Sequence, residues 1–242
     1  MNLKDKIVVI SGGSKGLGKE TAKLFTKSGC KVLICSRKKP ANDSPENKWY
    51  YKWKQVDISK NDEVQDFINW IKKEYGKIDI LINNAGFVGE LKPLEKITLE
   101  ELEEYININF IGTFLMTKHL LPIIQQSNET WLINISSQAG KKPVPNLSIY
   151  SATKSAIISM TQALSKESEN TNLNCITICP AGINTHMREK LFGKKDSLNQ
   201  QSPQSIAILI KQIVENIIPI QNGSVILIKE GKIQNIEISP NR

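Results

Sequence analysis

The 242-residue chain has no apolar run approaching the roughly 20 residues that a membrane-spanning helix needs. Its first residues, MNLKDKIVVISGG, enter a strand pattern directly and show no export signal. The four cysteines, Cys30, Cys35, Cys175 and Cys179, lack the spacing of metal ligands. We therefore expect a cytoplasmic protein with no membrane association, no bound metal and buried free thiols in a reducing compartment.

The chain has fewer acidic than basic residues: 24 Asp and Glu compared with 32 Lys and Arg, which gives a net charge of +8. Nucleic-acid binding requires a clustered basic stripe with interleaved aromatic residues. The nearest candidate, NKWYYKWK at 47–54, alternates in a way that a strand with one packed face explains better. We expect no nucleic-acid partner. The charge fits either a lysine-rich solvated surface or attraction to an anionic ligand.

The chain has no internal repeat and no linker that would divide it. Strand-like runs alternate with helical patterns; the strands are expected at 6–11, 31–36, 51–57, 78–83, 131–136, 174–179 and 224–229, and the helices at 17–28, 62–75, 99–121, 148–168 and 203–217. The strands are rich in Ile and Val on both faces, as buried parallel strands are. This pattern predicts one doubly wound, Rossmann-like α/β domain over residues 1–242, with helices on both sides of a parallel sheet.

Three segments depart from this alternation. Pro40 and Pro45 break the stretch between Arg37 and Lys52, so we expect no second crossover helix and a strand at the sheet edge with one aromatic face packed inward. The segment 181–203 is irregular and follows a strand end, which predicts a substrate loop or lid. Near the C-terminus, two alternating runs flank Glu230-Gly231, which predicts a β-hairpin adding an antiparallel edge strand; a frayed tail is the alternative.

A glycine-rich turn, SGGSKGLG at 11–18, connects the first strand to the first helix. Gly12, Gly16 and Gly18 leave room for backbone to approach a diphosphate, and the helix N-terminus offers unpaired N–H groups and a positive dipole end. The spacing is G-x-x-x-G-x-G, which differs from the G-x-G-x-x-G of most dinucleotide folds.

Four further motifs follow the turn in order: NNAG at 83–86, Asn109, Ser137 and YSATK at 150–154. With the glycine turn they resemble the short-chain dehydrogenase/reductase family in its single-domain form. The resemblance covers nearly the whole chain. It implies an oxidoreductase that reduces a ketone or aldehyde to an alcohol, or runs the reverse, by hydride transfer from a nicotinamide cofactor.

The residue at the end of the second strand bears on cofactor choice. NAD enzymes usually carry an acid there, which binds the ribose 2′-hydroxyl. This chain has Ser36, followed by Arg37, while Lys15 stands inside the glycine turn. A 2′-phosphate requires such cations, so the pattern predicts NADP(H). The alternative is that the charges after Ser36 are solvated loop charges.

The resemblance implies further cofactor contacts. In the family, Asp57 with Ile58 would contact the adenine, and Asn84 would line the cleft. CPAGINTHM at 179–187 matches the segment after the sixth strand, with Ala181 where Gly is common. The cofactor-binding residues expected in addition are Ser14, Leu17, Ala85, Gly86, Tyr150, Lys154, Pro180, Ile183 and Thr185.

The resemblance also implies the catalytic group. Tyr150 would donate a proton to the carbonyl oxygen, and Lys154, one helical turn away, would lower the phenol pKa and bind the ribose hydroxyls. Ser137 would be the second donor to that oxygen; Ser136 falls on the opposite face of the strand end. Asn109 would order a water-linked proton path, or be a packing residue.

The sequence limits the oligomeric state and the substrate only to broad classes. The two long helices form a common family interface, which predicts a homodimer, with a homotetramer as the alternative. The substrate would be a small carbonyl or alcohol, and acyl-thioester ketones, steroids, pterins, diketones and sugars all stay open. Lys141, Lys142, Arg188 and Lys190 near the expected pocket mouth favour an anionic or polar compound. The competing function is a non-catalytic NADP(H)-binding sensor or scaffold.

Overall fold

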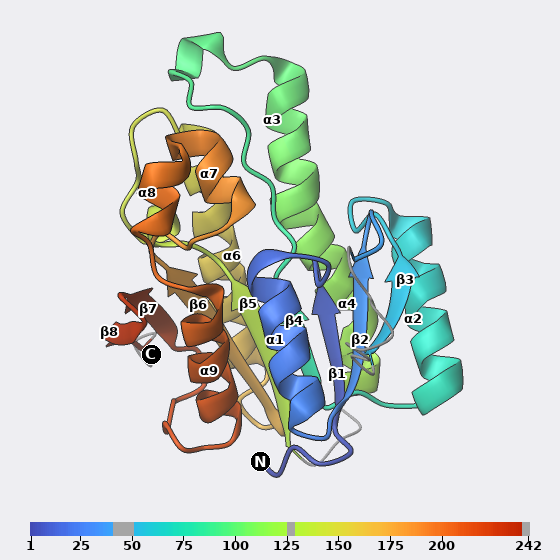
Figure 1. Ribbon diagram of the computed structural model, residues 1–242. Coiled ribbons are helices and arrows are strands. Elements are labelled where there is room, and N and C mark those ends of the chain that lie inside the picture. Colours follow the sequence, from blue (N-terminus) through green and yellow to red (C-terminus); the bar gives the residue numbers. More distant parts are fainter. Residues whose placement is uncertain (41–50, 125–128, 239–242) are drawn as a thin grey trace.

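The computed structural model describes residues 1–40, 51–124 and 129–238. Within them, eight strands form one sheet in the order β3-β2-β1-β4-β5-β6-β7-β8, with helices on both faces (Figure 1). All neighbouring pairs are parallel except β7 and β8. The strands are β1 (Ile7–Ser11), β2 (Lys31–Ser36), β3 (Tyr51–Gln55), β4 (Ile80–Asn83), β5 (Thr130–Ile135), β6 (Leu173–Pro180), β7 (Val225–Lys229) and β8 (Lys232–Glu237).

Helices alternate with these strands, and the predicted doubly wound α/β fold is confirmed. The helices are α1 (Gly16–Lys27), α2 (Asn61–Tyr75), α3 (Leu99–Tyr105), α4 (Gly112–Ile124), α5 (Gln138–Lys141), α6 (Ser148–Glu167), α7 (His186–Phe192), α8 (Lys194–Leu198) and α9 (Pro203–Val214), with a 3-10 turn η2 (Leu94–Lys96) and a π-helical turn η3 (Ile106–Ile111). The reading of residues 1–242 as one domain stays a prediction.

The sheet is buried on both faces, which explains why its central strands are mostly apolar. In β1, Val8 packs in a cluster with Phe25 of α1 and Ile210 of α9, whereas the next residue, Val9, packs in a second cluster with Ile71 of α2. All five side chains are completely buried. Because successive strand residues point to opposite faces, a strand between two helical layers has no polar side.

The strand order reverses beside β1, which positions the site. The chain winds from β1 outwards to β3, then crosses back to place β4 on the other side of β1. In sheets with such a reversal, ligands bind in the crevice outside the carboxyl ends of the strands at this point. The glycine turn and the NNAG segment follow these two strands.

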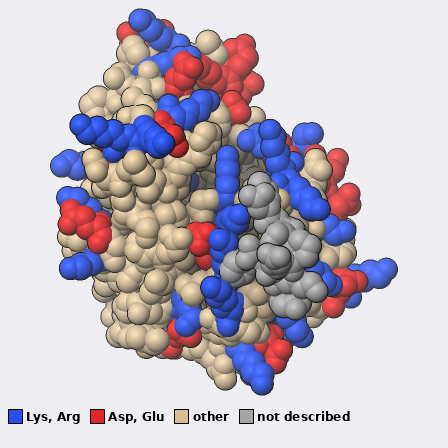
Figure 2. Space-filling view, in the orientation of Figure 1, with Lys and Arg blue, Asp and Glu red and all other residues tan. Residues whose placement is uncertain are grey.

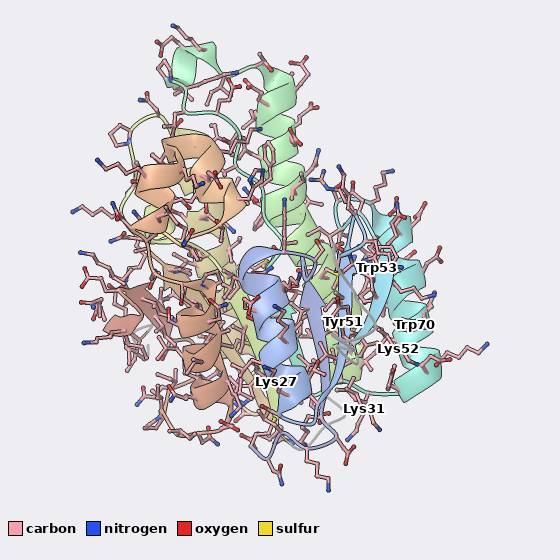
Figure 3. All side chains as sticks on the ribbon, in the orientation of Figure 1. Lys27, Lys31, Tyr51, Lys52, Trp53 and Trp70 are labelled. Atoms are coloured by element: carbon pink, nitrogen blue, oxygen red, sulfur yellow. The ribbon has the colours of Figure 1, made fainter. Side chains whose placement is uncertain are left out.

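The edge strand β3 is attached by aromatic side chains on both faces (Figure 3). Tyr51 and Trp53 are half-buried and pack against the apolar cluster on the α1 side, which confirms the predicted inward aromatic face. On the α2 side, Lys54 Nζ lies 4.9 Å from the Trp70 ring centroid. Such cation–π contacts contribute about 0.5–1 kcal/mol at exposed sites. They attach the strand to α2, while its lysines discourage pairing with another chain.

Two local predictions require correction, and one cannot be compared. The helix expected at 99–121 contains the π-helical turn η3, and the segment 181–203 is not irregular throughout, because it holds α7 and α8. Thr185 caps α7 by accepting the Arg188 N–H, and Gly193, with a φ of 83°, separates the two helices. The missing second crossover helix was predicted for residues 38–50, of which 41–50 lie outside the described residues.

The predicted C-terminal hairpin is present. β7 and β8 are joined by Glu230 and Gly231, whose φ angles of 54° and 69° form a two-residue turn of the kind that matches strand twist. Glu237 of β8 forms an ion pair with Lys141 of α5, which follows Ser137. The hairpin thus contacts the segment that carries a predicted catalytic residue.

The turn residue Glu230 yields a stability prediction. A non-glycine residue in the left-handed region costs about 1–2 kcal/mol, and Asn tolerates it better than Glu. Glu230→Asn should therefore raise the free energy of unfolding by about 0.5–1 kcal/mol, measured by urea denaturation. Glu230→Gln is the matched control, since both variants lose the Glu230–Lys229 ion pair. Equal stability of the two variants would contradict the prediction.

Candidate active site

The turn after β1 brings main chain from three segments together. Gly12 has a φ of 67°, and a Cβ on it would lie 2.7 Å from Ala85 Cα. A Cβ on Gly18 would lie 2.4 Å from the Gly12 carbonyl oxygen, and Gly16 has a φ of 55°. Only glycine fits such contacts and conformations at low cost. The three glycines predicted at the turn therefore each have a physical reason to lack a side chain.

Asn84, after β4, fastens this turn from the other side. Its Nδ2 donates to the carbonyl oxygens of Ser11 and Gly12, at 3.1 Å each. In return, Ser11 Oγ accepts the backbone N–H groups of Asn84 and Ala85 at 3.1 and 3.2 Å. Sequence reasoning missed Ser11; the signal for it was a polar residue at the last position of an apolar strand.

The N-terminus of α1 faces this crevice as an anion site. Lys15 occupies the N-cap position and provides no side-chain cap. A Cβ on Gly16 would lie 3.4 Å from Thr185 Cγ2, so the segment after β6 also reaches the turn. Ser14 is half-buried, whereas Leu17 is buried in the core. Backbone N–H groups, a positive dipole end and a cradle without side chains fit the diphosphate of a dinucleotide.

At the end of β2, Ser36 is hydrogen-bonded within the protein, and its contact with a cofactor stays a prediction. Its hydroxyl donates to the Lys38 carbonyl at 2.8 Å and accepts the Trp53 Nε1–H at 2.9 Å. The hydroxyl therefore has no proton left for a ribose or phosphate, since serine has only one. The next residue, Arg37, lines a groove of about 310 Å³.

Asp57 lies in the same groove, and its carboxylate is partly committed. Its Oδ1 accepts the Ser59 N–H at 3.1 Å and the Ser59 hydroxyl at 2.7 Å. The Ile58 side chain is buried, and a Cβ on Gly112 would lie 2.6 Å from it. The opposite wall of the groove is acidic, with Glu100, Glu103 and Glu104 of α3. Contact of Asp57 and Ile58 with an adenine stays a prediction.

The segment after β6 lies at the same end of the sheet. Pro180 ends β6, and Ile183 forms a parallel bridge with Gln201. Thr185 Oγ1 accepts the Arg188 N–H and donates to the Ile183 carbonyl, at 3.3 and 3.4 Å. These bonds fix the three predicted residues in a defined loop between β6 and α7.

Tyr150 and Lys154 lie in the first two turns of α6, and Lys154 Nζ is 5.9 Å from the Tyr150 ring centroid. Lys154 is 4% exposed, and its Nζ donates to the Ile135 carbonyl at the end of β5 at 3.0 Å. A Cβ on Gly86 would lie 3.3 Å from that Nζ. The crevice and the YSATK motif therefore meet at the lysine ammonium.

The choice between the two serines after β5 follows from their contacts. Ser136 is buried and donates to the Lys154 carbonyl at 2.8 Å. Ser137 Oγ accepts the Ala139 N–H at 3.1 Å, and an interaction with the same side chain lowers the pKa of Tyr150. Gly140 is required because a Cβ there would lie 2.8 Å from the Lys154 carbonyl carbon. Ser137 is thus the serine beside the phenol.

Asn109 lies in the π-helical turn and is fully buried. Its Oδ1 accepts the Phe87 N–H at 2.7 Å, and its Nδ2 donates to the Phe87 carbonyl at 3.0 Å and to Thr153 Oγ1 at 3.1 Å. Both donors are therefore used to hold the segment after β4 against α6. These bonds give Asn109 a packing role, and a water-linked proton path through Asn109 stays a prediction. π turns often occur at functional sites.

Burial dominates the electrostatics of the site. It raises the pKa of the Tyr150 phenol, and the hydrogen bond from Ser137 offsets part of that rise. It also lowers the pKa of Lys154 to about 8. The pKa of Tyr150 is therefore raised, mainly by burial, where a lowering by Lys154 was expected. The phenol is protonated at neutral pH, which is the form that donates a proton.

Two of the four cations expected at the pocket mouth are paired. Lys141 forms its ion pair with Glu237, and Arg188 binds Asp196 through Nε and Nη2 at 2.5 and 3.0 Å. Arg188 also stacks on Phe192, 3.8 Å from the ring centroid. These pairs lower the positive potential that an anionic substrate would meet at the pocket mouth.

Residues 1–40, 51–124 and 129–238 meet the requirements neither of a metal site nor of a membrane-spanning helix. No group of three or more His, Cys, Asp or Glu residues there could hold a metal ion. No helix in these ranges is long and apolar enough to cross a membrane. The four cysteines are free and buried, as predicted.

Comparison with known proteins identifies similar chains. A family model described as short chain dehydrogenase matches residues 6–196. The uncharacterized oxidoreductase YvrD of Bacillus subtilis is 35% identical over 184 residues, covering 74% of this chain and 69% of that protein. The NAD-dependent glycerol dehydrogenase of Listeria innocua is 34% identical over 193 residues, covering 79% and 76%. The 3-ketoacyl-(acyl-carrier-protein) reductase of Brucella melitensis complexed with NADH superposes with a TM-score of 0.87 at 27% identity, covering 95% and 98%.

Burial of Lys154 yields a prediction with a defined pH dependence. Its pKa falls from 10.5 to about 8 on folding, so below pH 8 the folded chain bears the full cost of a buried ammonium. Between the two values the unfolded chain binds more protons, so stability rises with pH. Lys154→Met should raise the free energy of unfolding at pH 7 by about 1–3 kcal/mol, after allowing for the lost hydrogen bond.

Urea denaturation of the parent and Lys154→Met at several pH values measures this difference. The gap should shrink as pH rises from 8 towards 10.5, because the parent lysine becomes neutral in that range. Lys166→Met, on the last turn of the same helix, is the control for general effects of the substitution. A less stable Lys154→Met at pH 7 would refute the claim that burial of this charge is costly.

Proposed function

The chain belongs to the short chain dehydrogenase family and is an oxidoreductase, and from this premise we propose that it is an NADPH-dependent carbonyl reductase that converts a ketone or aldehyde to an alcohol, or catalyses the reverse. The observation that carries the proposal is the convergence of Tyr150, Ser137 and Lys154 beside Gly86, the last residue of the NNAG segment. A nicotinamide dinucleotide supplies the hydride when bound.

The side chains account for the proton and for orientation. Tyr150, protonated at neutral pH, donates a proton to the carbonyl oxygen as the hydride reaches the carbonyl carbon. Ser137 Oγ accepts the Ala139 N–H, and its hydroxyl proton, which interacts with the phenol oxygen when no substrate is bound, would turn to the same carbonyl oxygen. Lys154 spends one of three N–H donors on Ile135, which leaves two for ribose hydroxyls and the phenol. Asn109 holds the Phe87 segment over this group.

The cofactor would lie along the crevice from the glycine turn to Lys154. Gly12, Gly16, Gly18 and the N-terminus of α1 would bind the diphosphate, with Thr185 beside them. Basic side chains gather over α1 (Figure 2). They recur at every fourth residue, at Lys15, Lys19, Lys23 and Lys27. Lys23 forms an ion pair with Glu20 at 2.9 Å, and Lys27 lies in the last turn of the helix. Lys15 and Lys19, at the start of the helix, are the cations that would attract a multiply charged anion to the turn.

The preference for NADPH over NADH rests on Arg37, Lys15 and the absence of an acid at position 36. The three glutamates on the α3 wall act in the opposite direction, since a 2′-phosphate is repelled by carboxylates. The Brucella melitensis structure contains NADH and the Listeria innocua relative is NAD-dependent. Arg37 is therefore the residue on which the proposal depends.

A homodimer through α4 and α6 stays a prediction, with a homotetramer as the alternative. On the α3–α4 segment, Leu99, Ile106 and Phe114 are exposed, at 65%, 37% and 40%. β8 covers the edge of β7, which a second contact through that edge would need. A non-catalytic sensor or scaffold is the alternative function, and it is disfavoured because Tyr150, Lys154 and Ser137 are all retained and in contact range.

Cofactor choice can be tested directly. Arg37→Asp should reduce the ratio of kcat/KM for NADPH to kcat/KM for NADH by about 100-fold. The variant replaces a cation beside the 2′-phosphate by a carboxylate, which repels the phosphate. Steady-state oxidation of both cofactors with one carbonyl substrate gives the ratio. Lys39→Asp, two residues further along the same loop, is the control for net charge. Equal kcat/KM for both cofactors in the parent would refute the preference.

The reaction itself is tested by removing the phenol oxygen. Tyr150→Phe should leave the Kd for NADPH within about threefold while turnover falls by 100-fold or more, because the variant lacks the proton donor. The parent is first assayed for NADPH oxidation against ketones, aldehydes and diketones. Tyr105→Phe, on the neighbouring helix, is a control that loses only its bond to the Gly89 N–H. Cofactor binding without turnover on any compound would favour the sensor.

A further inference from the structure

A single hydroxyl closes the turn that follows β2. Ser36 Oγ donates to the Lys38 carbonyl at 2.8 Å, and the turn between them carries Arg37. The Trp53 Nε1–H, from the neighbouring strand β3, donates to the same oxygen at 2.9 Å. Ser36 is 9% exposed, so water competes poorly for either bond. The edge strand and the proposed cofactor turn therefore share one hydrogen-bonded atom.

The chemistry of the three groups determines which of them donates and which accepts in the hydrogen bonds from Trp53 to Ser36 and from Ser36 to Lys38. The indole N–H is only a donor, so Ser36 must accept from Trp53. A serine hydroxyl has one proton, and with Trp53 on a lone pair that proton is directed at the Lys38 carbonyl. Trp53 thus selects the rotamer of Ser36 that closes the turn. Removing the indole N–H would free the hydroxyl to rotate and leave the turn less ordered.

Trp53 is itself well placed to hold the turn. Its backbone pairs with Ile34 of β2, two residues before Ser36, and its side chain packs against the core cluster on the α1 face. The Val56 N–H donates to the Ser36 carbonyl at 3.2 Å, so β3 contacts this serine through main chain and side chain. Beyond the turn, Arg37 lines the groove that also contains Asp57.

We propose that Trp53 is a positioning residue for cofactor specificity, which acts through Ser36 to hold Arg37 at the 2′ position of the adenosine ribose. The inference rests on the proposed NADPH-dependent function. Trp53 touches neither the diphosphate turn nor the catalytic group, so its influence is confined to the part of the dinucleotide that distinguishes NADPH from NADH. The edge strand β3, which carries Trp53, would thus take part in the choice of cofactor.

Isothermal titration of NADPH and NADH into the purified protein tests this without relying on turnover. Trp53→Phe keeps an aromatic ring and removes the donor, so the Kd for NADPH should rise about three- to tenfold, the range for one hydrogen bond. The Kd for NADH should change less than about twofold, because NADH lacks the 2′-phosphate. If Trp53 served folding alone, Trp53→Phe would change the Kd for NADPH and the Kd for NADH by the same factor, or would change neither.

Further variants separate the hydrogen bond from packing. Ser36→Ala breaks the same chain at its centre and should reproduce the effect of Trp53→Phe, and the double variant should be no weaker than either. Ser36→Thr restores a hydroxyl and should recover parental affinity for NADPH. Trp70→Phe is the matched control, because Trp70 lies at the same sheet edge and contacts Lys54 instead of the turn. In an Arg37→Gln background, Trp53→Phe should have no further effect on NADPH.

The outcomes distinguish this inference from the proposed function. If the parent binds neither dinucleotide, the proposed function fails and the inference fails with it. If the parent binds NADPH and both Trp53→Phe and Ser36→Ala leave the ratio of the two dissociation constants unchanged, the inference alone is overturned. Should Trp53→Phe not fold, Ser36→Ala decides the question, since the serine side chain contributes no apolar packing.

Discussion

An ammonium group held out of water is the constraint on which the cleft depends. Lys154 Nζ is bound by the Ile135 carbonyl, and a Cβ on Gly86 would lie 3.3 Å from that Nζ. A Cβ on Gly140 would lie 2.8 Å from the Lys154 carbonyl carbon, so the backbone of the same residue is also closely packed. The end of β5, the segment after β4 and helix α5 therefore all pack against one residue of α6. Desolvation lowers its pKa to about 8, and the free energy of that burial has to come from the two apolar clusters around the sheet.

Much of the fold and part of the site could be predicted from the sequence, because their signals are local. Alternation of apolar runs and helical patterns gives the sheet, and the spacing of Tyr150 and Lys154 places both on one helix face. Other partners are distant in sequence: Ser11 binds a segment 73 residues away, and Asn109 binds Thr153 across 44 residues. No local pattern encodes which polar side chains meet, since packing of the whole chain decides it. The π turn around Asn109 was missed for the same reason.

Charged and polar side chains gave the least reliable predictions, because sequence shows a charge but not its partner. Lys141 and Arg188 were expected to attract substrate, yet Glu237 and Asp196 pair with them. Ser36 was expected to face the cofactor, yet its hydroxyl is used within the protein. An exposed pair of this kind contributes about 0–1 kcal/mol to stability, but it removes the charge from the field that a ligand meets.

The ion pair between Glu237 and Lys141 has a practical consequence for handling the protein. β8 ends within a few residues of the C-terminus, and its last residue holds the short helix that begins after Ser137. An affinity tag or a fluorescent reporter fused there would pull on a strand attached to the reaction centre. The N-terminus precedes β1 and lies at the amino ends of the strands, away from the crevice (Figure 1). A fusion at that end would instead disturb Met1, which packs against the core cluster and whose ammonium pairs with Glu129.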